Sequence, residues 1–119
     1  TTEYMATTAQ TNDPIVSVAA GLKIVVTEIG AFVDNATTVN VGVRIGFGAA
    51  SVPAEPADGA SVAGVVLSHS GIAPGSGVVR GSGAGILGIG ADDEDLRITN
   101  SVPTSGKLRV LVSYYTIES

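Results

Sequence analysis

The sequence predicts an all-β protein, an antiparallel β-sandwich of about eight strands with a jelly-roll-like arrangement. Val and Ile, with 17 and 9 copies, outnumber the 6 Leu residues, and side chains branched at Cβ favour a pleated sheet. The 16 Gly and 5 Pro residues interrupt the chain too often for long helices. No glycine-free segment carries apolar residues at helical spacing. The 119 residues suit one domain with a core of its own.

The chain is expected to begin with an N-terminal arm at residues 1–13, followed by a single sandwich domain at residues 14–119. The arm sequence, TTEYMATTAQTND, is polar and rich in Thr, and Tyr4 and Met5 are its only large apolar residues. This segment can dock on a neighbouring chain, pair as an edge strand, or remain a frayed terminus. Tyr4 and Met5 are therefore candidate interface residues.

Two strands are expected after the turn that the Asp-Pro pair at positions 13 and 14 predicts. The first is IVSV at residues 15–18, and the second is the longer LKIVVTEIGAFV at residues 22–33. The longer strand is apolar on both faces, which is typical of a strand at the centre of a sheet or at an interface. An Asp-Asn pair then predicts the next turn.

Period-two alternation is clearest in the strand VNVGVRIGF at residues 39–47. Val39 and every second residue after it are apolar and are expected to face the core. The residues between them, which include Arg44, are expected to face outward. Glycines in this outward set expose backbone, so they indicate either the close approach of a neighbouring chain or a β-bulge.

Short strands and turns are expected in the second half of the chain. The loop GAASVPAEPADGAS at residues 48–61 is long enough to predict a functional or mobile segment. The strand VAGVVLSH at residues 62–69 and a turn-rich connection at residues 70–77 follow it. VVRGSG and GILGIG are expected to form one bent strand or two short ones, and LRITNS alternates again. The closing strand, KLRVLVSYYTIE, occupies residues 107–118.

The closing strand contains two adjacent tyrosines, Tyr114 and Tyr115. Because neighbouring residues of a strand point to opposite faces, one tyrosine is expected inside and the other outside. Tyr114 shares its parity with Val110 and Val112, so Tyr115 is the outward residue. Aromatic side chains are common at protein interfaces, and Tyr115 is therefore a candidate contact with a partner.

Gly83, Gly85 and Gly88 spell G-x-G-x-x-G, the motif of dinucleotide-binding proteins. In such proteins the motif opens a helix, whose N-terminus faces the pyrophosphate. Here the motif is followed by another glycine and four acidic residues, which would repel a phosphate. The acidic residue expected about twenty positions further on is also absent. We therefore expect no nucleotide and no other cofactor at this segment.

The four consecutive acidic residues raise the alternative of a calcium site, because Ca²⁺ binds several oxygen ligands. Adjacent residues on an extended chain point in opposite directions, and the spaced D-x-D-x-D-G pattern of a calcium loop is missing. We expect a solvated acidic turn, which can contact a basic side chain of another copy. The acidic residues are Asp92, Asp93, Glu94 and Asp95. The candidate basic partners are Arg44, Arg80 and Arg109.

Composition narrows the classes of function. The formal net charge is −5, and the chain has no basic cluster, so nucleic acid and anionic membranes are poor partners. Charged residues make up only 14% of the chain, which suits packing against other subunits, although a monomer rich in small residues would have the same composition. No run is long and apolar enough to span a membrane.

The sequence offers little for catalysis. The chain has no Cys, so it can form neither a disulfide nor a cysteine nucleophile. His69 is the single His and has no acidic residue at a fixed spacing. A Ser-His-acid triad assembled from separate segments stays open as an alternative. We expect a protein without enzymatic activity and without a metal site.

Three stretches resemble the small jelly-roll virion proteins of tailed bacteriophages, namely capsid decoration (cement) proteins, head-fibre bases and tail-spike modules. They are IVSVAAGLKIVVTEIGAFVDNATTVNVGVRIGFG at residues 15–48, GSGAGILGIGADDEDLRITNSVPTSGKLRV at residues 81–110, and VSYYTIE at residues 112–118. The resemblance lies in strand rhythm and composition and covers most of the chain from residue 15. It implies a homotrimer in the virion, made in the host bacterial cytoplasm and seated on a capsid or tail surface. Its partner would be the major capsid protein or another virion protein.

The resemblance implies a capsid decoration protein that trimerises and stabilises the head shell by burying surface between capsomers. The alternative is a receptor- or glycan-binding module of a tail fibre, spike or head fibre, with its site in the loops at residues 48–61 and 70–77. The small number of aromatic residues is unfavourable for sugar binding. A third reading is an enzyme or a metal-dependent lectin that uses His69 and the acidic run.

Overall fold

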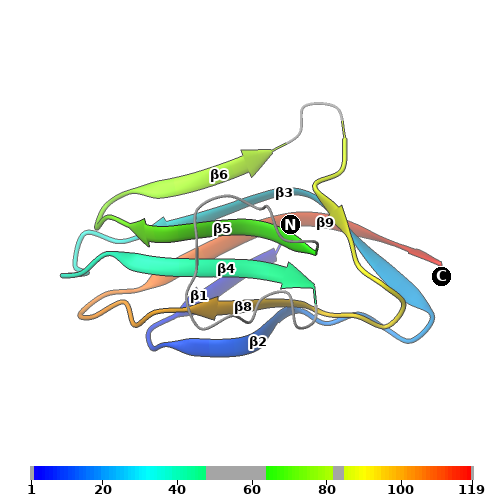
Figure 1. The fold of residues 1–119 in the computed structure, drawn as a ribbon, viewed down its shortest axis with the longest axis horizontal. Coiled ribbons are helices and arrows are strands. Elements are labelled where there is room, and N and C mark those ends of the chain that lie inside the picture. Colours follow the sequence, from blue (N-terminus) through cyan, green and yellow to red (C-terminus); the bar gives the residue numbers. More distant parts are fainter. Residues whose placement is uncertain (1, 48–63, 82–84, 119) are drawn as a thin grey trace.

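The computed structural model describes residues 2–47, 64–81 and 85–118, which form nine β-strands and no helix. The strands lie in two antiparallel sheets that pack face to face (Figure 1). The predicted all-β sandwich is therefore confirmed. The loop expected at residues 48–61 lies outside the described residues.

The larger sheet, sheet A, has five strands. Four of them follow the order β1-β9-β3-β6, and the short β7 also pairs with β3. The two long strands, β3 and β9, are therefore neighbours at the centre of the sheet. The strands are β1 (Thr2–Ala6), β9 (Leu108–Glu118), β3 (Leu22–Val33), β6 (Gly77–Gly81) and β7 (Gly88–Ile89).

The smaller sheet, sheet B, has four strands in the order β2-β8-β4-β5. Both β2 and β5 are edge strands, and β4 and β8 lie between them. In Figure 1 this sheet is in front of sheet A. The strands are β2 (Gln10–Val16), β8 (Leu96–Asn100), β4 (Val41–Phe47) and β5 (Val65–Ile72).

The two sheets have the strand order of a jelly roll. Starting from the middle of the chain, β4 pairs with β5, β3 with β6, β2 with β8, and β1 with β9. The chain is thus one long antiparallel ribbon whose two halves run side by side. Folding this ribbon over brings β3 beside β9 and β4 beside β8, which closes the two sheets. The jelly-roll-like arrangement expected from the sequence follows from this nested pairing.

A continuous apolar core fills the space between the sheets. It is built mainly from β-branched side chains, which pack well on a pleated surface. Each fully buried side chain of this size contributes about 1.5–3 kcal/mol of hydrophobic stabilisation. The largest fully buried side chains include Ile24, Ile29, Ile45, Ile72, Leu96, Ile98 and Leu108.

The N-terminal segment forms edge strands in both sheets. β1 pairs with β9 at the edge of sheet A, and β2 pairs with β8 at the edge of sheet B. The Tyr4 hydroxyl donates a 2.6 Å hydrogen bond to the Asp13 carboxylate and so links the two edges. Partial burial, together with Asp13, raises the pKa of Tyr4. Of the three alternatives for this segment, the structure has the edge strand, and the boundary expected between residues 13 and 14 falls inside β2.

Strand β4 keeps the alternation expected from the sequence, but its outer face is buried as well. Its core-facing residues from Val41 to Phe47 are buried, and Arg44, which faces outward as expected, is only 8% exposed. Val39 precedes the strand and is 41% exposed, so the expectation of a core Val39 was wrong. The strand partners of Arg44 on the outer face, Ser68 and Thr99, are buried too.

Other boundaries moved by a few residues. The Asp-Pro pair lies within β2 and not in a turn. β2 is an edge strand with a partner on one side only, and such a strand can contain a proline because not every N–H is needed for pairing. The strand expected at residues 62–69 is described from Val65 and extends to Ile72, so the connection that follows is shorter than expected. The two stretches VVRGSG and GILGIG contain two separate strands, β6 and β7.

We predict that Ile98→Ala lowers the free energy of unfolding by about 2–5 kcal/mol, because it leaves a cavity in the core. Ile98 is fully buried and lies opposite Ile45 in the middle of sheet B. Val102→Ala is the control, since Val102 is 47% exposed and its truncation should change stability by no more than about 0.5 kcal/mol. Urea denaturation of both variants measures the difference, and equal stabilities would contradict the position of Ile98 in the core.

Candidate interaction surface

The outer face of sheet A, which points away from sheet B, carries a band of apolar side chains. Met5 on β1 and Val79 on β6 are 52% and 63% exposed. Phe32 on β3 and Leu111 on β9 are half-buried. Their chain neighbours belong to the core, so strand alternation directs these four side chains outward. We call Met5, Phe32, Val79 and Leu111 the apolar band.

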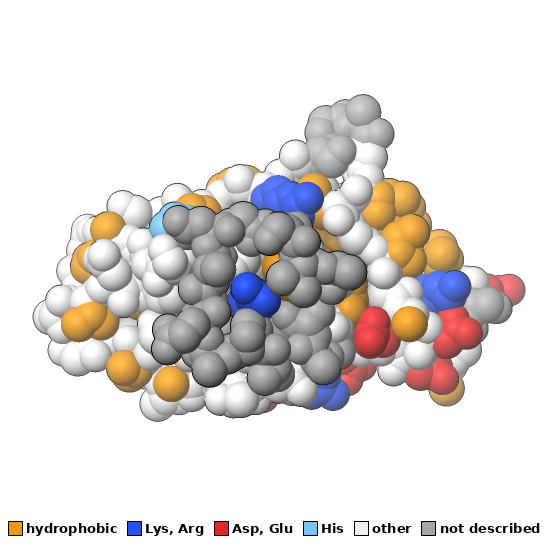
Figure 2. Space-filling view, in the orientation of Figure 1, with side chains coloured by type: hydrophobic (Ala, Val, Ile, Leu, Met, Phe, Trp, Pro, Cys, Tyr) orange, Lys and Arg blue, Asp and Glu red, His pale blue; other side chains and the backbone are white. Residues whose placement is uncertain are grey.

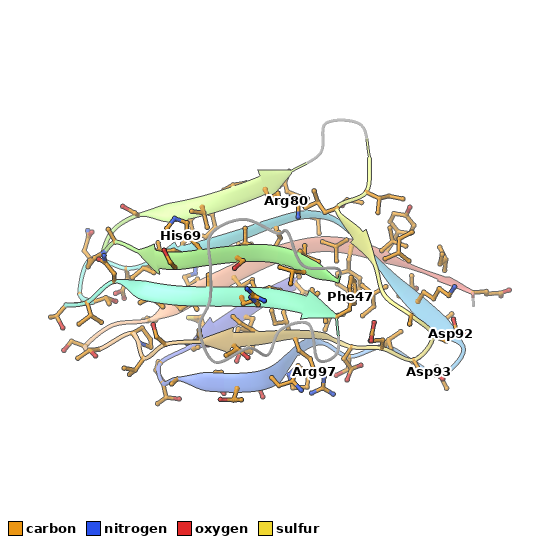
Figure 3. The ribbon with its side chains drawn as sticks, in the orientation of Figure 1. Phe47, His69, Arg80, Asp92, Asp93 and Arg97 are labelled. Atoms are coloured by element: carbon orange, nitrogen blue, oxygen red, sulfur yellow. The ribbon has the colours of Figure 1, made fainter. Side chains whose placement is uncertain are left out.

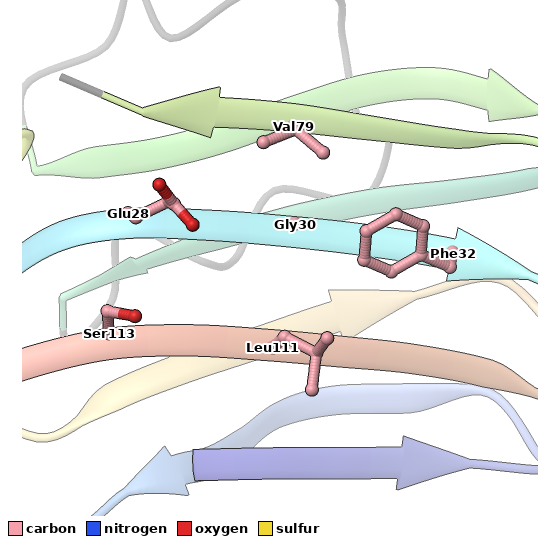
Figure 4. Close-up of a pocket in the computed structure, with 6 residues that line it drawn as sticks. All are labelled: Glu28, Gly30, Phe32, Val79, Leu111 and Ser113. Atoms are coloured by element: carbon pink, nitrogen blue, oxygen red, sulfur yellow. The ribbon is translucent and has the colours of Figure 1, made fainter. Parts of the chain in front are cut away.

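A depression of about 200 Å³ lies on the apolar band. Figure 4 shows the Phe32 ring at one end and the Glu28 carboxylate and the Ser113 hydroxyl at the other. The depression thus combines apolar walls with a negative group and a hydroxyl. Its lining residues are Glu28, Gly30, Phe32, Val79, Leu111 and Ser113.

Two glycines make room for the Phe32 ring. A Cβ atom on Gly30 would lie 2.8 Å from the ring, and one on Gly77, across the β3–β6 pair, would lie 2.3 Å from it. Both distances are too short for non-bonded carbon atoms. The ring therefore lies against bare backbone, which sets the floor of the depression. The sequence analysis did not predict this site, because a glycine and an aromatic residue on different strands give no local pattern.

An ion pair lies within the apolar band, because Arg109 is opposite both Met5 and Phe32, and Glu3 is opposite Leu111. The Arg109 guanidinium binds the Glu3 carboxylate across the β1–β9 pair. Their side chains are 50% and 40% exposed, so the pair adds little to stability in water. Arg109, a candidate partner for an acidic turn of another copy, is thus already paired within its own chain.

A second apolar group lies at the other end of the outer face. Tyr115 is 48% exposed and lies opposite Val25 of β3, while its neighbour Tyr114 packs against the core. The expected inward and outward directions of the two tyrosines agree with the structure. Ile89 of β7 also lies opposite Val25, on its other side, and is 50% exposed.

The acidic turn between β7 and β8 binds its own chain. Asp92 pairs with Lys23 at 3.5 Å, and the Asp93 carboxylate accepts a 2.8 Å hydrogen bond from the Gly21 N–H. Asp93 has a left-handed backbone with φ of 61°, a conformation that Asp tolerates better than most residues. Figure 3 shows Asp92 and Asp93 beside the connection from β2 to β3.

The other two acidic residues have different partners. The Glu94 carboxylate accepts a 3.1 Å hydrogen bond from the Ala91 N–H. Asp95 accepts a 2.9 Å hydrogen bond from the Val18 N–H and pairs with Arg97 at 3.2 Å. The four carboxylates therefore have separate partners, and Asp93 and Asp95 tie the β7–β8 connection to the β2–β3 connection. Within residues 2–47, 64–81 and 85–118, no three His, Asp or Glu side chains are placed to hold a metal ion.

Packing explains Gly88 of the G-x-G-x-x-G motif and Gly90, which follows the motif. Gly88 lies in β7, and a Cβ there would contact Val66 and Phe47 at 3.3 and 3.4 Å. Gly90 is closer still, because its Cβ would lie 2.7 Å from the Phe47 ring. These glycines let the chain cross the end of the core above Phe47, which Figure 3 labels. Gly83 lies outside the described residues.

The remaining candidates have contacts inside the chain. The half-buried Arg80 donates a hydrogen bond to the Val66 carbonyl and so joins β6 of sheet A to β5 of sheet B. His69 accepts a hydrogen bond from the Gly71 N–H through Nδ1 at 3.1 Å. Another copy can reach Arg109 and part of Arg80 directly, but it cannot reach the buried Arg44 without rearrangement.

Comparison with family models, with curated proteins and with solved structures found no match for the chain. The described part of the chain contains no helix with the length and apolar character needed to cross a membrane.

We predict that Asp95→Ala destabilises the fold by about 1–3 kcal/mol, because it leaves the Val18 N–H without its acceptor and Arg97 with only the Asn12 carbonyl of its two acceptors. Asp92→Ala is the matched control, since the Asp92–Lys23 pair is more exposed and contributes about 0–1 kcal/mol. Thermal unfolding of both variants, with and without Ca²⁺, measures the effect. Strong stabilisation of the parent chain by Ca²⁺ would contradict a turn held by internal hydrogen bonds.

Proposed function

We propose that the chain is a structural protein of the bacteriophage virion, a capsid decoration protein that attaches through the outer face of sheet A. The observation that carries the proposal is the apolar band, on which Met5 and Val79 expose more than half of their surface. Large apolar side chains grouped on one face of a soluble domain are typical of a surface that a partner covers.

The mechanism is burial of surface on a rigid support. Phe32 and Leu111 of the apolar band lie on β3 and β9, whose inner faces pack in the core, so little order has to be gained there on attachment. Stable protein contacts bury about 800 Å² on each partner. A contact of this size between the decoration protein and two neighbouring capsomers opposes their separation. The homotrimer implied by the resemblance would add sister subunits to the contacts.

The depression supplies specificity to the proposed contact. Its apolar walls suit an aliphatic or aromatic side chain of the shell protein, and Glu28 and Ser113 provide an acceptor and a hydroxyl at one end. A residue with an apolar stem and a basic or hydroxyl tip would satisfy both parts. The binding energy would then depend on a few residues around Phe32.

The outer face supports this proposal better than the loops support a receptor-binding module. The connection between β5 and β6 is a tight turn in which the Gly75 N–H donates a 2.9 Å hydrogen bond to the Val33 carbonyl. Gly75 has φ of 76°, and a Cβ there would lie 2.2 Å from the Asn35 side chain. This connection is therefore held against its own chain. The other candidate loop lies outside the described residues.

We predict that Val79→Asp lowers the occupancy of the chain on phage particles by about tenfold or more, because attachment would bury an unpaired carboxylate. The particles are those of the phage that encodes the chain, and mass spectrometry of purified virions measures the copy number. Val102→Asp is the matched control, because Val102 is also an exposed valine but lies in the β8–β9 connection and not on a strand of the apolar band.

The two variants should fold equally well, and circular dichroism checks this before assembly. If the Val79→Asp variant is lost from the particles while the Val102→Asp variant is retained, the result supports attachment through the outer face. Equal occupancy of both variants would refute the role of the apolar band. Absence of the parent chain from purified particles would refute the virion assignment itself.

A further inference from the structure

The C-terminal part of β9 extends beyond the strand that flanks it on one side. β1 pairs with β9 from Leu108 to Val112, whereas β3 continues to pair with it up to Glu118. Among the described residues, no strand lies on the β1 side of residues 113–118. Figure 1 shows this end of β9 projecting toward the C-terminus at the edge of the molecule. Sheet A therefore has an open strand edge next to an exposed tyrosine.

The backbone groups that face this open edge can be identified from the ladder. The Ile24 and Val26 carbonyls accept hydrogen bonds from the β7 side of β3, so the N–H and C=O of Val25, between them, face β9. Val25 lies opposite Tyr115, and the direction of backbone groups alternates along a strand. The residues whose N–H and C=O groups face the open edge are Tyr114, Thr116 and Glu118.

The other edges of sheet A and one edge of sheet B carry features that hinder pairing with another chain. β2 contains Pro14, two register shifts and a left-handed Asn12. β1 and β6 are short, with five residues each. The open edge of β9 has the sequence YYTIE at residues 114–118, without Pro, Gly or Lys. It lacks the usual protections against pairing.

The side chains beside the open edge are apolar on the outer face. Tyr115 and Ile117 alternate with the residues that face the core side, and they are 48% and 39% exposed. Val25 and Ile89 continue the same row on β3 and β7. Figure 2 views the molecule from the sheet B side, and hydrophobic side chains are visible on that side too, between β7 and the C-terminus.

We propose that two copies of the chain pair antiparallel along residues 114–118, around a twofold axis at Thr116. In this register Thr116 lies opposite the partner's Thr116, and Tyr114 lies opposite the partner's Glu118. Each of these residues directs its N–H and C=O to the open edge, so all of them are satisfied at once. The two A sheets become one continuous sheet across the axis.

The side chains fit this register and no change of fold is needed. Tyr115 lies opposite the partner's Ile117, an aromatic and β-branched pair of the kind that stabilises antiparallel strands. An apolar row then runs from Ile89 through Val25 and Tyr115 to the partner's Ile117. The two Glu118 carboxylates do not face each other, because each lies opposite a tyrosine. The edge is therefore self-complementary in backbone, in packing and in charge.

The pairing also bears on attachment. Because the two sheets are continuous, their outer faces lie on the same side, and the two apolar bands can contact one surface together. Two linked contacts bind far more tightly than one. The inference itself does not depend on the virion assignment, and its test uses the chain alone, so its failure would leave attachment through the apolar band untouched.

Cysteine cross-linking tests the register. The chain has no Cys, so Thr116→Cys places a single thiol on the proposed axis, where the two Cα atoms would be about 5.5 Å apart, within the range of a disulfide. Thr104→Cys is the matched control, an exposed Thr in the β8–β9 connection. Under mild oxidation we expect disulfide-linked dimers of Thr116→Cys in at least about tenfold excess over the control.

Proline substitution tests the backbone contact separately. Thr116→Pro removes an N–H that faces the open edge and leaves the bonds to β3 in place, so the fold should survive. Loss of the symmetric hydrogen bonds should raise the dimer dissociation constant about tenfold or more in sedimentation equilibrium. Cross-linking of Thr116→Cys no greater than that of Thr104→Cys would overturn the proposal, and so would unchanged association of a folded Thr116→Pro variant.

Discussion

The pairing of β3 with β9 is the interaction on which the rest of the structure depends. These two strands are the longest in the molecule and pair from Leu22 and Glu118 at one end to Val33 and Leu108 at the other. Their inner faces supply eight of the nineteen buried residues of the core, and their outer faces carry Phe32 and Leu111 of the apolar band. The part of β9 that only β3 supports forms the open edge. The same pair of strands therefore contributes to the core, to the apolar band and to the open edge.

Polar residues outside the β3–β9 pair mainly form hydrogen bonds that join loops, sheets and edge strands to one another. The acidic turn holds the β2–β3 connection through Asp93 and Asp95, Arg80 joins the two sheets, and Tyr4 links the two N-terminal edge strands. Each of these groups has a partner within the chain. Residues that the sequence marks as interface candidates therefore also stabilise the fold. The exposed apolar residues of sheet A have no such partner, and they carry the argument about function.

The fold class could be predicted because it depends on composition and period-two alternation, which are local. The directions of Tyr114 and Tyr115 followed from the same rule. The burial of Arg44 could not be predicted, because alternation assigns a residue to a face but does not say whether that face is covered. The depression around Phe32 depends on Gly30 and Gly77, and Gly77 is brought beside Phe32 only by the β3–β6 register. Such features require knowledge of which strands become neighbours.

The nesting of the ribbon has a consequence for biosynthesis. The contact between Glu3 and Arg109 spans 106 positions, and among the described strands β1 pairs only with β9. On the ribosome, the first strand must therefore wait, unpaired, until the last one has left the exit tunnel. Sheet A can close only after β9, residues Leu108–Glu118, has left the exit tunnel, and contacts this distant in the chain make closure slow. A newly made molecule thus passes through a period in which β3, its longest apolar strand, has no β9 beside it. During this period, chaperones or rapid folding must protect the molecule from aggregation.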